Sequence, residues 1–351
     1  MSKLFHKDKP IIGLDINQTG IKIMSVNSKR WQVTGYGSVD LDPVKVQKSL
    51  DEGDGYLSDN IQALVKNKIV GSLPSRQVVL GIPTGRTFSR TFTLPVKAEN
   101  TLKEAVVIEA EQYIPVPVNL LYLDWDIIGR DKENITVVMS AVPKKLVDST
   151  IQAAKNAGLE VEMVEPGMNA IARVLQATED AHLPTAIIDI GPANTDIAVL
   201  EGGVIRVTGG IGIGSNTFTL DIAKKLGVSL ENAHQLKVLN GMSVSPRQKK
   251  ITAALKPSLE RIVTETRKVI RYYTERLNDE HKIEQILIVG GGSNIPGIGD
   301  YFTNELVMPA RVAVPWQKLD FGTLPQPSKQ FRPRYVTVAG LASVPEGSIW
   351  S

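Results

Sequence analysis

Short apolar runs that end at polar turns recur along this chain, and one arrangement of them occurs twice. Residues 11–26 consist of two apolar runs on either side of a polar turn at 17–20. Such a pattern predicts a β-hairpin. About half a chain later, residues 186–200 repeat the arrangement around a turn at 192–195. The repetition predicts an internal duplication, in which two related halves each begin with a hairpin.

The segment between the two hairpins alternates between strand-like and helix-like patterns. The expected strands are 31–39, 78–83, 87–94, 121–128, 135–142 and 160–164, and the expected helices are 43–50, 58–68, 100–113, 144–157 and 168–177. Thr101 and Glu104 have the spacing of a capping box at the start of one helix. Gly158 suits the C-terminal end of another. The part from about 76 to 166 is therefore expected to form a small α+β module.

The second half of the chain continues the alternation. Its expected strands are 204–208 and 285–289, and its expected helices are 216–226, 230–239, 257–277, 298–306 and 336–343. Pro257 suits the first turn of the longest helix. Residues 317–334 are rich in proline and are expected to be irregular. Alternating strands and helices predict a protein of the α/β class.

Composition mainly excludes classes of function. The 351 residues carry a net charge of only +3, with scattered basic residues, which argues against a nucleic-acid partner. Cysteine is absent, so disulfides, Cys-ligated zinc and thiol nucleophiles are excluded. The histidines lie far apart and have no metal-ligand spacing. Residues 1–7 lack the apolar core of a signal peptide, and no run reaches the roughly 18–20 apolar residues that span a bilayer. We expect a cytoplasmic protein that is held at a membrane only through a partner.

The two hairpins carry the most informative polar residues. Asp15 and Asp189 each end a buried strand beside a turn whose amides, together with the Thr19 or Thr195 hydroxyl, can bind phosphate oxygens. The two carboxylates suit Mg²⁺, which keeps several of its waters, and Lys22 adds a positive charge. Aspartates at strand ends often serve only as caps. Their repetition at the head of each half favours the functional interpretation.

A third element is the glycine run Gly290–Gly292 after an apolar strand. Glycines there let the backbone approach a ligand closely, such as an adenine ring or its ribose. The run has neither the spacing of the dinucleotide-binding fingerprint nor the Gly-Lys-Ser/Thr of a Walker A loop.

Together these segments resemble a known group of proteins. Gly13–Asp15, the turn from Asp189 to Thr195, and Gly290–Gly292 resemble the phosphate 1, phosphate 2 and adenosine motifs of actin-like ATPases. Glu109–Pro115 and Gly290–Gly297 resemble segments characteristic of PilM, the FtsA-like family of type IV pilus assembly proteins.

The resemblance implies a two-lobed actin-like ATPase fold that binds ATP and Mg²⁺ between its lobes. The expected division is a first lobe of 1–75 and 167–185, an FtsA-type 1C insertion subdomain of 76–166, and a second lobe of 186–351. Mg²⁺ is expected at Asp15 and Asp189, and Asp189 or Asp196 is expected to orient the attacking water. The expected nucleotide-binding residues are Asp15, Asn17, Gln18, Thr19, Lys22, Asp189, Gly191, Asn194, Thr195, Glu260, Arg261, Gly290, Gly291, Gly292 and Asn294.

The resemblance also implies a partner, because PilM captures the N-terminal cytoplasmic tail of the inner-membrane protein PilN in a groove beside the inserted module. Other pilus assembly ATPases and further copies of the chain are additional expected partners. The chain departs from the family in its first turn, where Asn17-Gln18-Thr19-Gly20 replaces the usual Gly-Ser-Ser-Ser. In the second turn, Pro192 lacks an N–H. Both departures predict weak ATPase activity at most.

Two other functions fit the same fold. An FtsA-like division tether usually ends in a basic amphipathic helix that lies on the membrane, and residues 345–351 are not expected to form one. A sugar-kinase-type phosphotransferase needs a catalytic Asp in a substrate pocket, and such kinases are commonly longer. We therefore expect a cytoplasmic, ATP-binding scaffold of pilus assembly at the inner face of the membrane.

Overall fold

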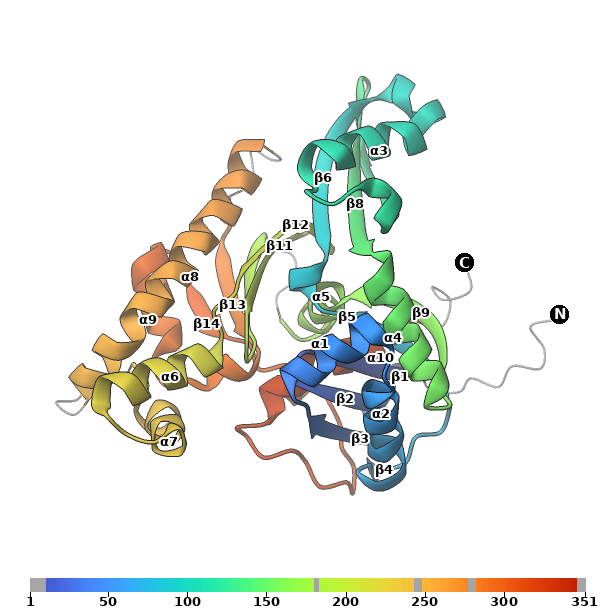
Figure 1. Cartoon of the computed structure of the whole chain (residues 1–351). Helices are drawn as coiled ribbons and strands as arrows, with labels where there is room; N and C mark the ends of the chain where they lie inside the picture. The colour runs from blue at the N-terminus through green and yellow to red at the C-terminus, as the bar shows by residue number, and fades with distance from the viewer. Residues whose placement is uncertain (1–10, 180–182, 243–247, 277–281, 346–351) are drawn as a thin grey trace. The chain divides into compact units, whose positions relative to one another are not determined.

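A computed structural model describes residues 11–179, 183–242, 248–276 and 282–345. Contacts divide the chain into two compact units (Figure 1). Unit 1 comprises Met1–Val174, Pro315–Gln326 and Tyr335–Ser351, and unit 2 comprises Leu175–Val314 and Pro327–Arg334. The expectations for segment 1–7, for the chain end at 346–351 and for His6, His182 and His281 fall outside the described residues. In the described part of the chain, no helix is both long and apolar enough to cross a membrane.

Unit 1 is built on a 6-stranded sheet with the order β4-β3-β2-β1-β5-β9. The strands are β1 (Ile12–Asn17), β2 (Gly20–Asn27), β3 (Gln32–Asp40), β4 (Val70–Gly71), β5 (Gln77–Ile82) and β9 (Glu160–Pro166). One face packs against α1 (Pro43–Glu52), α2 (Tyr56–Asn67) and α4 (Lys144–Asn156). The last helix, α10 (Val336–Ala342), contacts β1, β2 and β5, and α5 (Gly167–Thr178) follows β9.

Successive residues of β1 face opposite sides of the sheet, and each side is covered by different helices. Ile12, Leu14 and Ile16 are buried in the core formed with α1, α2 and α4. Gly13 points the opposite way, where a Cβ atom would lie 2.4 Å from the Val338 carbonyl oxygen of α10. Only glycine lets α10 approach β1 this closely. Because side chains alternate along a strand, Asp15 follows Gly13 on the face that α10 covers.

The inserted module of unit 1 contains three antiparallel strands covered by one helix. Its strands β6 (Phe88–Pro95), β8 (Asn134–Pro143) and β7 (Leu121–Arg130) pair in that order, all antiparallel. Helix α3 (Leu102–Tyr113) packs on it through Val106 and Ala110. Short 3-10 helices at Thr84–Arg86, Val96–Thr101 and Val118–Leu120 connect these elements.

Of the two helix ends predicted from the sequence, one prediction is wrong and the other is confirmed. The capping box at Thr101 is wrong, because a 3-10 helix runs directly into α3 and the Thr101 side chain makes no capping hydrogen bond. The glycine at the end of α4 is confirmed. Gly158 has a φ of +82°, its N–H donates to the Lys155 carbonyl, and the N–H of Leu159 donates to the Ala154 carbonyl. These bonds form a Schellman motif.

Unit 2 contains five neighbouring strands, in the order β14-β13-β10-β11-β12. The strands are β10 (Thr185–Ile190), β11 (Thr195–Glu201), β12 (Val204–Ile211), β13 (Gln285–Val289) and β14 (Ala310–Val312). The helices are α6 (Ser215–Leu226), α7 (Leu230–Asn240), α8 (Gln248–Arg276) and α9 (Ile298–Leu306). Figure 1 shows α8 lying along one face of this sheet, where Leu255, Leu259 and Ile262 join its core.

Helix α8 corrects one expectation. Pro257 lies inside the helix and not in its first turn, because α8 already includes Gln248. The physical reason is that the apolar stripe extends upstream of the proline: Ile251, Ala254 and Leu255 are all buried in the core of unit 2. Burial of this face outweighs the helix-breaking tendency of one proline.

The sheets of the two units share one topology. In unit 1, β1 pairs antiparallel with β2 and parallel with β5, and β5 pairs parallel with β9. In unit 2, β10 pairs antiparallel with β11 and parallel with β13, and β13 pairs parallel with β14. The third strand of each, β3 or β12, extends its hairpin in the same antiparallel sense. Both hairpins expected from the sequence are confirmed, and the matching order agrees with the expected duplication.

Candidate functional site

The first hairpin holds a shielded ion pair. Asp15 and Lys22 lie directly opposite each other on β1 and β2. The Lys22 Nζ atom is 3.0 Å from Asp15 Oδ2, and the two side chains are only 15% and 11% exposed. The ammonium group therefore already neutralises the carboxylate at this strand end.

The turn of this hairpin is closed by its own side chains. Asn17 Oδ1 accepts hydrogen bonds from the Thr19 backbone N–H and from Thr19 Oγ1, at 3.0 Å each. Asn17 Nδ2 donates to Asp15 Oδ2 over 3.4 Å, whereas Gln18 is exposed. The two Thr19 donors that the sequence assigned to phosphate are thus bound to Asn17 in this structure.

The second hairpin places two carboxylates opposite each other. Asp189 on β10 pairs in register with Asp196 on β11, so both side chains project from the same face of the sheet. The Gly191 N–H donates to the Asn194 carbonyl over 2.9 Å. Thr195 is fully buried, and its hydroxyl donates to the Ile213 carbonyl over 2.7 Å. The pair of carboxylates occupies the position that Asp15 and Lys22 occupy in the first hairpin.

The first turn of α6 lies against this second turn. The N–H groups of Ser215 and Asn216 donate to the Gly191 and Pro192 carbonyls, each over 2.9 Å. Gly214 permits the contact, because a Cβ atom there would lie 2.6 Å from the Gly191 carbonyl oxygen. Strand, turn and helix N-terminus thus form one compact structure in unit 2.

The three glycines after β13 have different roles. Gly290 has a φ of +82°, and a Cβ atom there would lie 2.2 Å from Asp189 Oδ1. At Gly292 a Cβ atom would lie 2.2 Å from Ile190 Cγ2. Gly291 is different, since a Cβ atom there would meet Arg334 Cγ at 3.5 Å as its nearest neighbour. Gly290 and Gly292 therefore let β10 approach, whereas a Cβ atom at Gly291 would make only an ordinary contact.

Sequence reasoning missed a buried lysine in α7. Lys237 is 3% exposed, and its Nζ donates to Ser215 O, Ser215 Oγ and Thr219 Oγ1 at 2.8, 2.7 and 2.8 Å. Burial lowers the pKa of Lys237 to about 8, and the charge of Arg334 acts in the same direction. The same helix exposes Leu230 and Leu239 at 56% and 76%. Only the fold reveals this reversal of the usual pattern, in which a lysine is buried and two leucines are exposed. Local rules are most often broken at functional sites.

Arg334 and His234 lie close to Lys237. Arg334 adjoins Gly291 and is close enough to Lys237 and His234 to lower the pKa of both. For His234 the largest cause is desolvation by burial, followed by the charges of Lys237 and Arg334. The glycine turn, the start of α6 and the side chains of Lys237, Arg334 and His234 therefore surround one region of unit 2.

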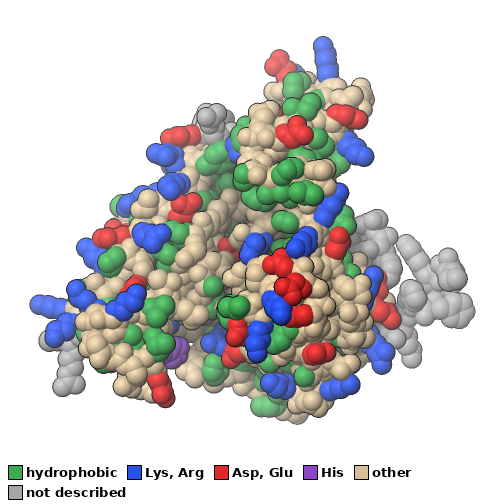
Figure 2. Space-filling view, in the orientation of Figure 1, with side chains coloured by type: hydrophobic (Ala, Val, Ile, Leu, Met, Phe, Trp, Pro, Cys, Tyr) green, Lys and Arg blue, Asp and Glu red, His purple; other side chains and the backbone are tan. Residues whose placement is uncertain are grey.

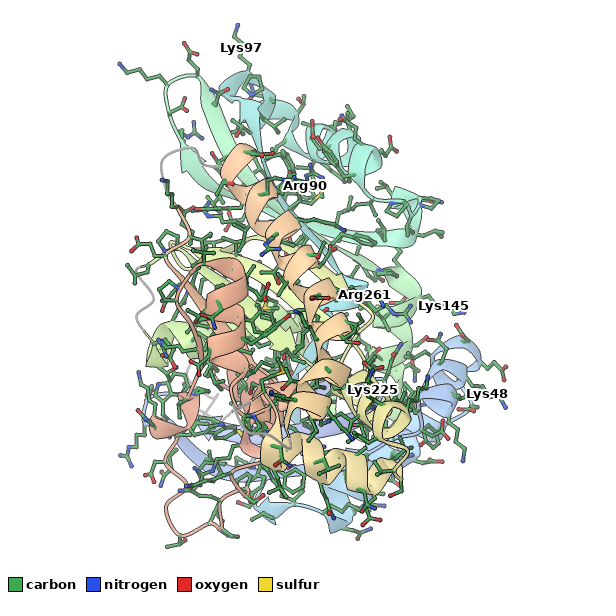
Figure 3. All side chains as sticks on the ribbon, turned by 90° about the vertical axis from the view of Figure 1, so that its left-hand side faces the viewer. Lys48, Arg90, Lys97, Lys145, Lys225 and Arg261 are labelled. Atoms are coloured by element: carbon green, nitrogen blue, oxygen red, sulfur yellow. The ribbon has the colours of Figure 1, made fainter. Side chains whose placement is uncertain are left out.

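The remaining expected residues are Glu260 and Arg261 on α8 and Asn294 beside the glycine turn. Glu260 and Arg261 are on the exposed face of α8, where Glu260 pairs with Lys256 over 3.6 Å. Figure 3, which looks onto α8, shows the Arg261 side chain on the surface of that helix. Asn294 Nδ2 donates to the Gln330 carbonyl over 2.7 Å and to the Gly291 carbonyl over 3.3 Å. Asn294 thereby connects the glycine turn to segment 327–334.

The geometry fits a phosphorylated ligand with a divalent cation. Two facing carboxylates, Asp189 and Asp196, match the oxygen ligands that Mg²⁺ takes alongside phosphates and water. Arg334 and Lys237 supply positive charge beside the glycine turn, and Gly291 gives access to the backbone. Asp15 already has Lys22 as a counter-ion and belongs to unit 1, whereas Asp189 belongs to unit 2.

Comparison with known proteins gives the family. Residues 13–344 match the family described as type IV pilus assembly protein PilM. The cell division protein FtsA of Agrobacterium fabrum is 21% identical over 93% of this chain and 79% of its own length.

Solved structures support the same fold. The present structure matches a chain of a solved PilM–PilN type IV pilus biogenesis complex with a TM-score of 0.78 and 22% sequence identity. The match covers 96% of this chain and 99% of the chain in that complex. MreB5 of Spiroplasma citri bound to ADP reaches a TM-score of 0.52 at 15% identity, covering 97% of each chain. The expected two-lobed, actin-like α/β fold is confirmed. The chain belongs to the PilM family of type IV pilus assembly proteins.

Proposed function

We propose that this protein is an ATP-binding scaffold of type IV pilus assembly, which binds the cytoplasmic N-terminal tail of a PilN-like inner-membrane protein. The observation that carries the nucleotide part is the repeated hairpin. Each unit places an aspartate two residues before a turn, at the same position of the same sheet topology. Family membership supplies the pilus context, and a PilM relative has been solved with PilN.

The residues of unit 2 would hold most of the nucleotide. Asp189 and Asp196 would hold Mg²⁺, directly or through its waters, while Arg334 and Lys237 would bring positive charge to the ligand beside Gly291. The bound metal would neutralise phosphate charge. Asp196 is also well placed to orient a water molecule, because it faces Asp189 across the hairpin. Binding rather than rapid hydrolysis is the proposed role, with the nucleotide acting as a switch.

The inserted module supports the partner part of the proposal. Large apolar side chains are exposed on it: Ile108 at 58%, Leu120 at 53%, Tyr122 at 47% and Tyr113 at 45%. Figure 2 shows hydrophobic side chains gathered over this part of unit 1. Exposed apolar patches of this kind commonly mark sites of protein interaction.

Strand β7 offers a specific way of binding an extended tail. Within the described residues, β7 pairs with β8 alone and is the last strand of its sheet. An extended peptide can add to such an edge through backbone hydrogen bonds. Asp124 and Asp126 alternate with Trp125 along β7, and both aspartates are exposed. Their charge complements the lysines and arginines that are enriched in cytoplasmic segments next to membrane spans.

Replacing Tyr122 by alanine should weaken tail binding by about 10- to 30-fold, because interface tyrosines often contribute ~2 kcal/mol. The measurement is fluorescence anisotropy with a labelled peptide that has the sequence of the partner's cytoplasmic tail. Leu239→Ala is the control, since it removes an apolar side chain from unit 2 that is even more exposed than Tyr122. Equal losses in both variants, or no binding by the wild-type protein, would contradict the assignment of the tail to this module.

A further inference from the structure

We infer that Asn17 competes with the nucleotide for the phosphate-binding donors of the first turn, an inference that rests on the nucleotide-binding function proposed above. Its side chain occupies the place of a phosphate oxygen when no nucleotide is bound. Asn17 therefore sets the affinity of this chain for nucleoside triphosphates.

Two donors of the first turn converge on one oxygen. The Thr19 N–H and the Thr19 hydroxyl both point to Asn17 Oδ1, at 3.0 Å each. Amides and hydroxyls of a turn that converge on a single acceptor form the arrangement that binds anions in many turns. The neutral amide oxygen of Asn17 satisfies these donors from within the chain.

Other contacts fix the backbone of the first turn. The Leu41 N–H donates to the Thr19 carbonyl over 2.9 Å. A Cβ atom on Gly20 would lie 2.7 Å from the Val39 carbonyl oxygen, so the turn packs tightly against β3. The Asn17 side chain can therefore leave without a rearrangement of the donors that it covers.

The second hairpin offers a comparison within the same chain, because its turn has glycine where the first turn has Asn17. Asp189 precedes Gly191 by two residues, just as Asp15 precedes Asn17, and both aspartates are strand residues paired across their hairpins. Gly191 has no side chain to fold over its turn. Asn17→Gly would therefore give the first turn the same residue as the second at the equivalent position.

The network around Asn17 explains why its displacement has a cost. Asp15 Oδ2 accepts hydrogen bonds from both Asn17 Nδ2 and Lys22 Nζ, at 3.4 and 3.0 Å. A phosphate that takes over the Thr19 donors must break the two bonds to Asn17 Oδ1, and it must share Lys22 with Asp15. Both requirements lower the affinity for ATP.

The test is isothermal titration calorimetry with Mg·ATP on nucleotide-free protein. Asn17→Gly should bind about tenfold more tightly than wild type, a change of ~1.4 kcal/mol. Asn17→Asp, which adds a negative charge beside the phosphate, should bind at least about tenfold more weakly. Asn27→Gly is the matched control. Asn27 is the last residue of β2, as Asn17 is the last residue of β1, and its side chain accepts a hydrogen bond from the Arg30 N–H over 3.2 Å.

The affinities of these variants test the role of Asn17 separately from the proposed nucleotide binding. Tighter binding by Asn17→Gly and unchanged binding by Asn27→Gly support it. Equal affinities of wild type and Asn17→Gly would overturn the role of Asn17 and leave nucleotide binding standing. If neither the wild-type protein nor Asn17→Gly binds Mg·ATP, both the role of Asn17 and the proposed nucleotide binding are wrong. Asn17→Ala, whose side chain has no acceptor for the Thr19 donors, should show the same direction of change if the glycine variant unfolds.

Discussion

Replacing Arg173 by methionine should lower the free energy of unfolding by about 3–5 kcal/mol, because it leaves a buried carboxylate without its counter-ion. Arg173 Nη1 and Nη2 donate to Glu165 Oε1 and Oε2 over 2.8 and 2.7 Å. Glu165 is 3% exposed, and Arg173 Nη1 also donates to the Gly340 carbonyl of α10 over 2.8 Å. The arginine thus connects β9, α5 and α10 within unit 1. Urea unfolding followed by circular dichroism measures the loss.

The control for this prediction is an exposed pair in the same unit. Arg130 pairs with Glu99, and these side chains are 50% and 38% exposed. Arg130→Met should cost less than about 1 kcal/mol, since water already solvates both groups. Adding Glu165→Gln to Arg173→Met should recover part of the stability, because the remaining buried group is then neutral. Equal losses for Arg173→Met and Arg130→Met would contradict the assignment of a buried, stabilising pair.

Replacing Gly290 by alanine should destabilise unit 2 by roughly 2–5 kcal/mol, the sum of a left-handed backbone and an overpacked contact. The φ of +82° disfavours any residue with a Cβ atom, and that atom would lie 2.2 Å from Asp189 Oδ1. The added methyl group would also displace a carboxylate that is proposed to hold the metal. We therefore expect both a lower thermal midpoint and a loss of Mg·ATP binding.

A substitution at the adjacent Gly291 separates the effect on stability from the effect on Mg·ATP binding. At Gly291 the new Cβ atom would meet Arg334 Cγ at 3.5 Å, an ordinary contact. Gly291→Ala should therefore leave the thermal midpoint within a few degrees of wild type, and should weaken Mg·ATP binding because it fills space reserved for the ligand. Calorimetry and thermal unfolding of the two variants measure both quantities. A Gly291→Ala protein with wild-type affinity would show that no ligand approaches this turn.

Local patterns were enough to predict the elements around the candidate site. The hairpins were predictable because apolar runs flank short polar turns, and Asp15 and Asp189 stand out as charged residues at the ends of such runs. The glycine turn was predictable for the same reason. The role of each glycine was not, because it depends on contacts of Gly290 and Gly292 with β10 about 100 residues away.

Long-range packing accounts for what the sequence did not predict. Gly13 was assigned to a phosphate motif, whereas its position is also required for the approach of α10, which comes more than 300 residues later. Lys237 was missed because a lysine in a surface-like helix is ordinarily exposed. Only the fold shows that Ser215 and Thr219 satisfy its ammonium group. The side chain of Asn17 could be recognised as bulk in the turn, but not as the acceptor that holds the Thr19 donors.

The three-part division of the chain and the complete set of site residues remain predictions. Asp15, Asn17, Gln18, Thr19 and Lys22 do cluster in one hairpin of unit 1, and Asp189, Gly191, Asn194 and Thr195 cluster in one hairpin of unit 2. Glu260 and Arg261 lie on the exposed face of α8. Arg334 adjoins Gly291 of the glycine turn, so it is the better candidate for a contact to the nucleotide. Lys237 adds positive charge nearby, while its ammonium group donates to Ser215 and Thr219.

The most direct test of the central claim is a titration of the nucleotide-free wild-type protein with Mg·ATP, in the presence and absence of the partner's tail peptide. The account predicts one ATP bound per chain in a magnesium-dependent manner, and a peptide affinity that changes when ATP is bound. Absence of any heat of binding with Mg·ATP, together with a failure to bind the peptide, would contradict it.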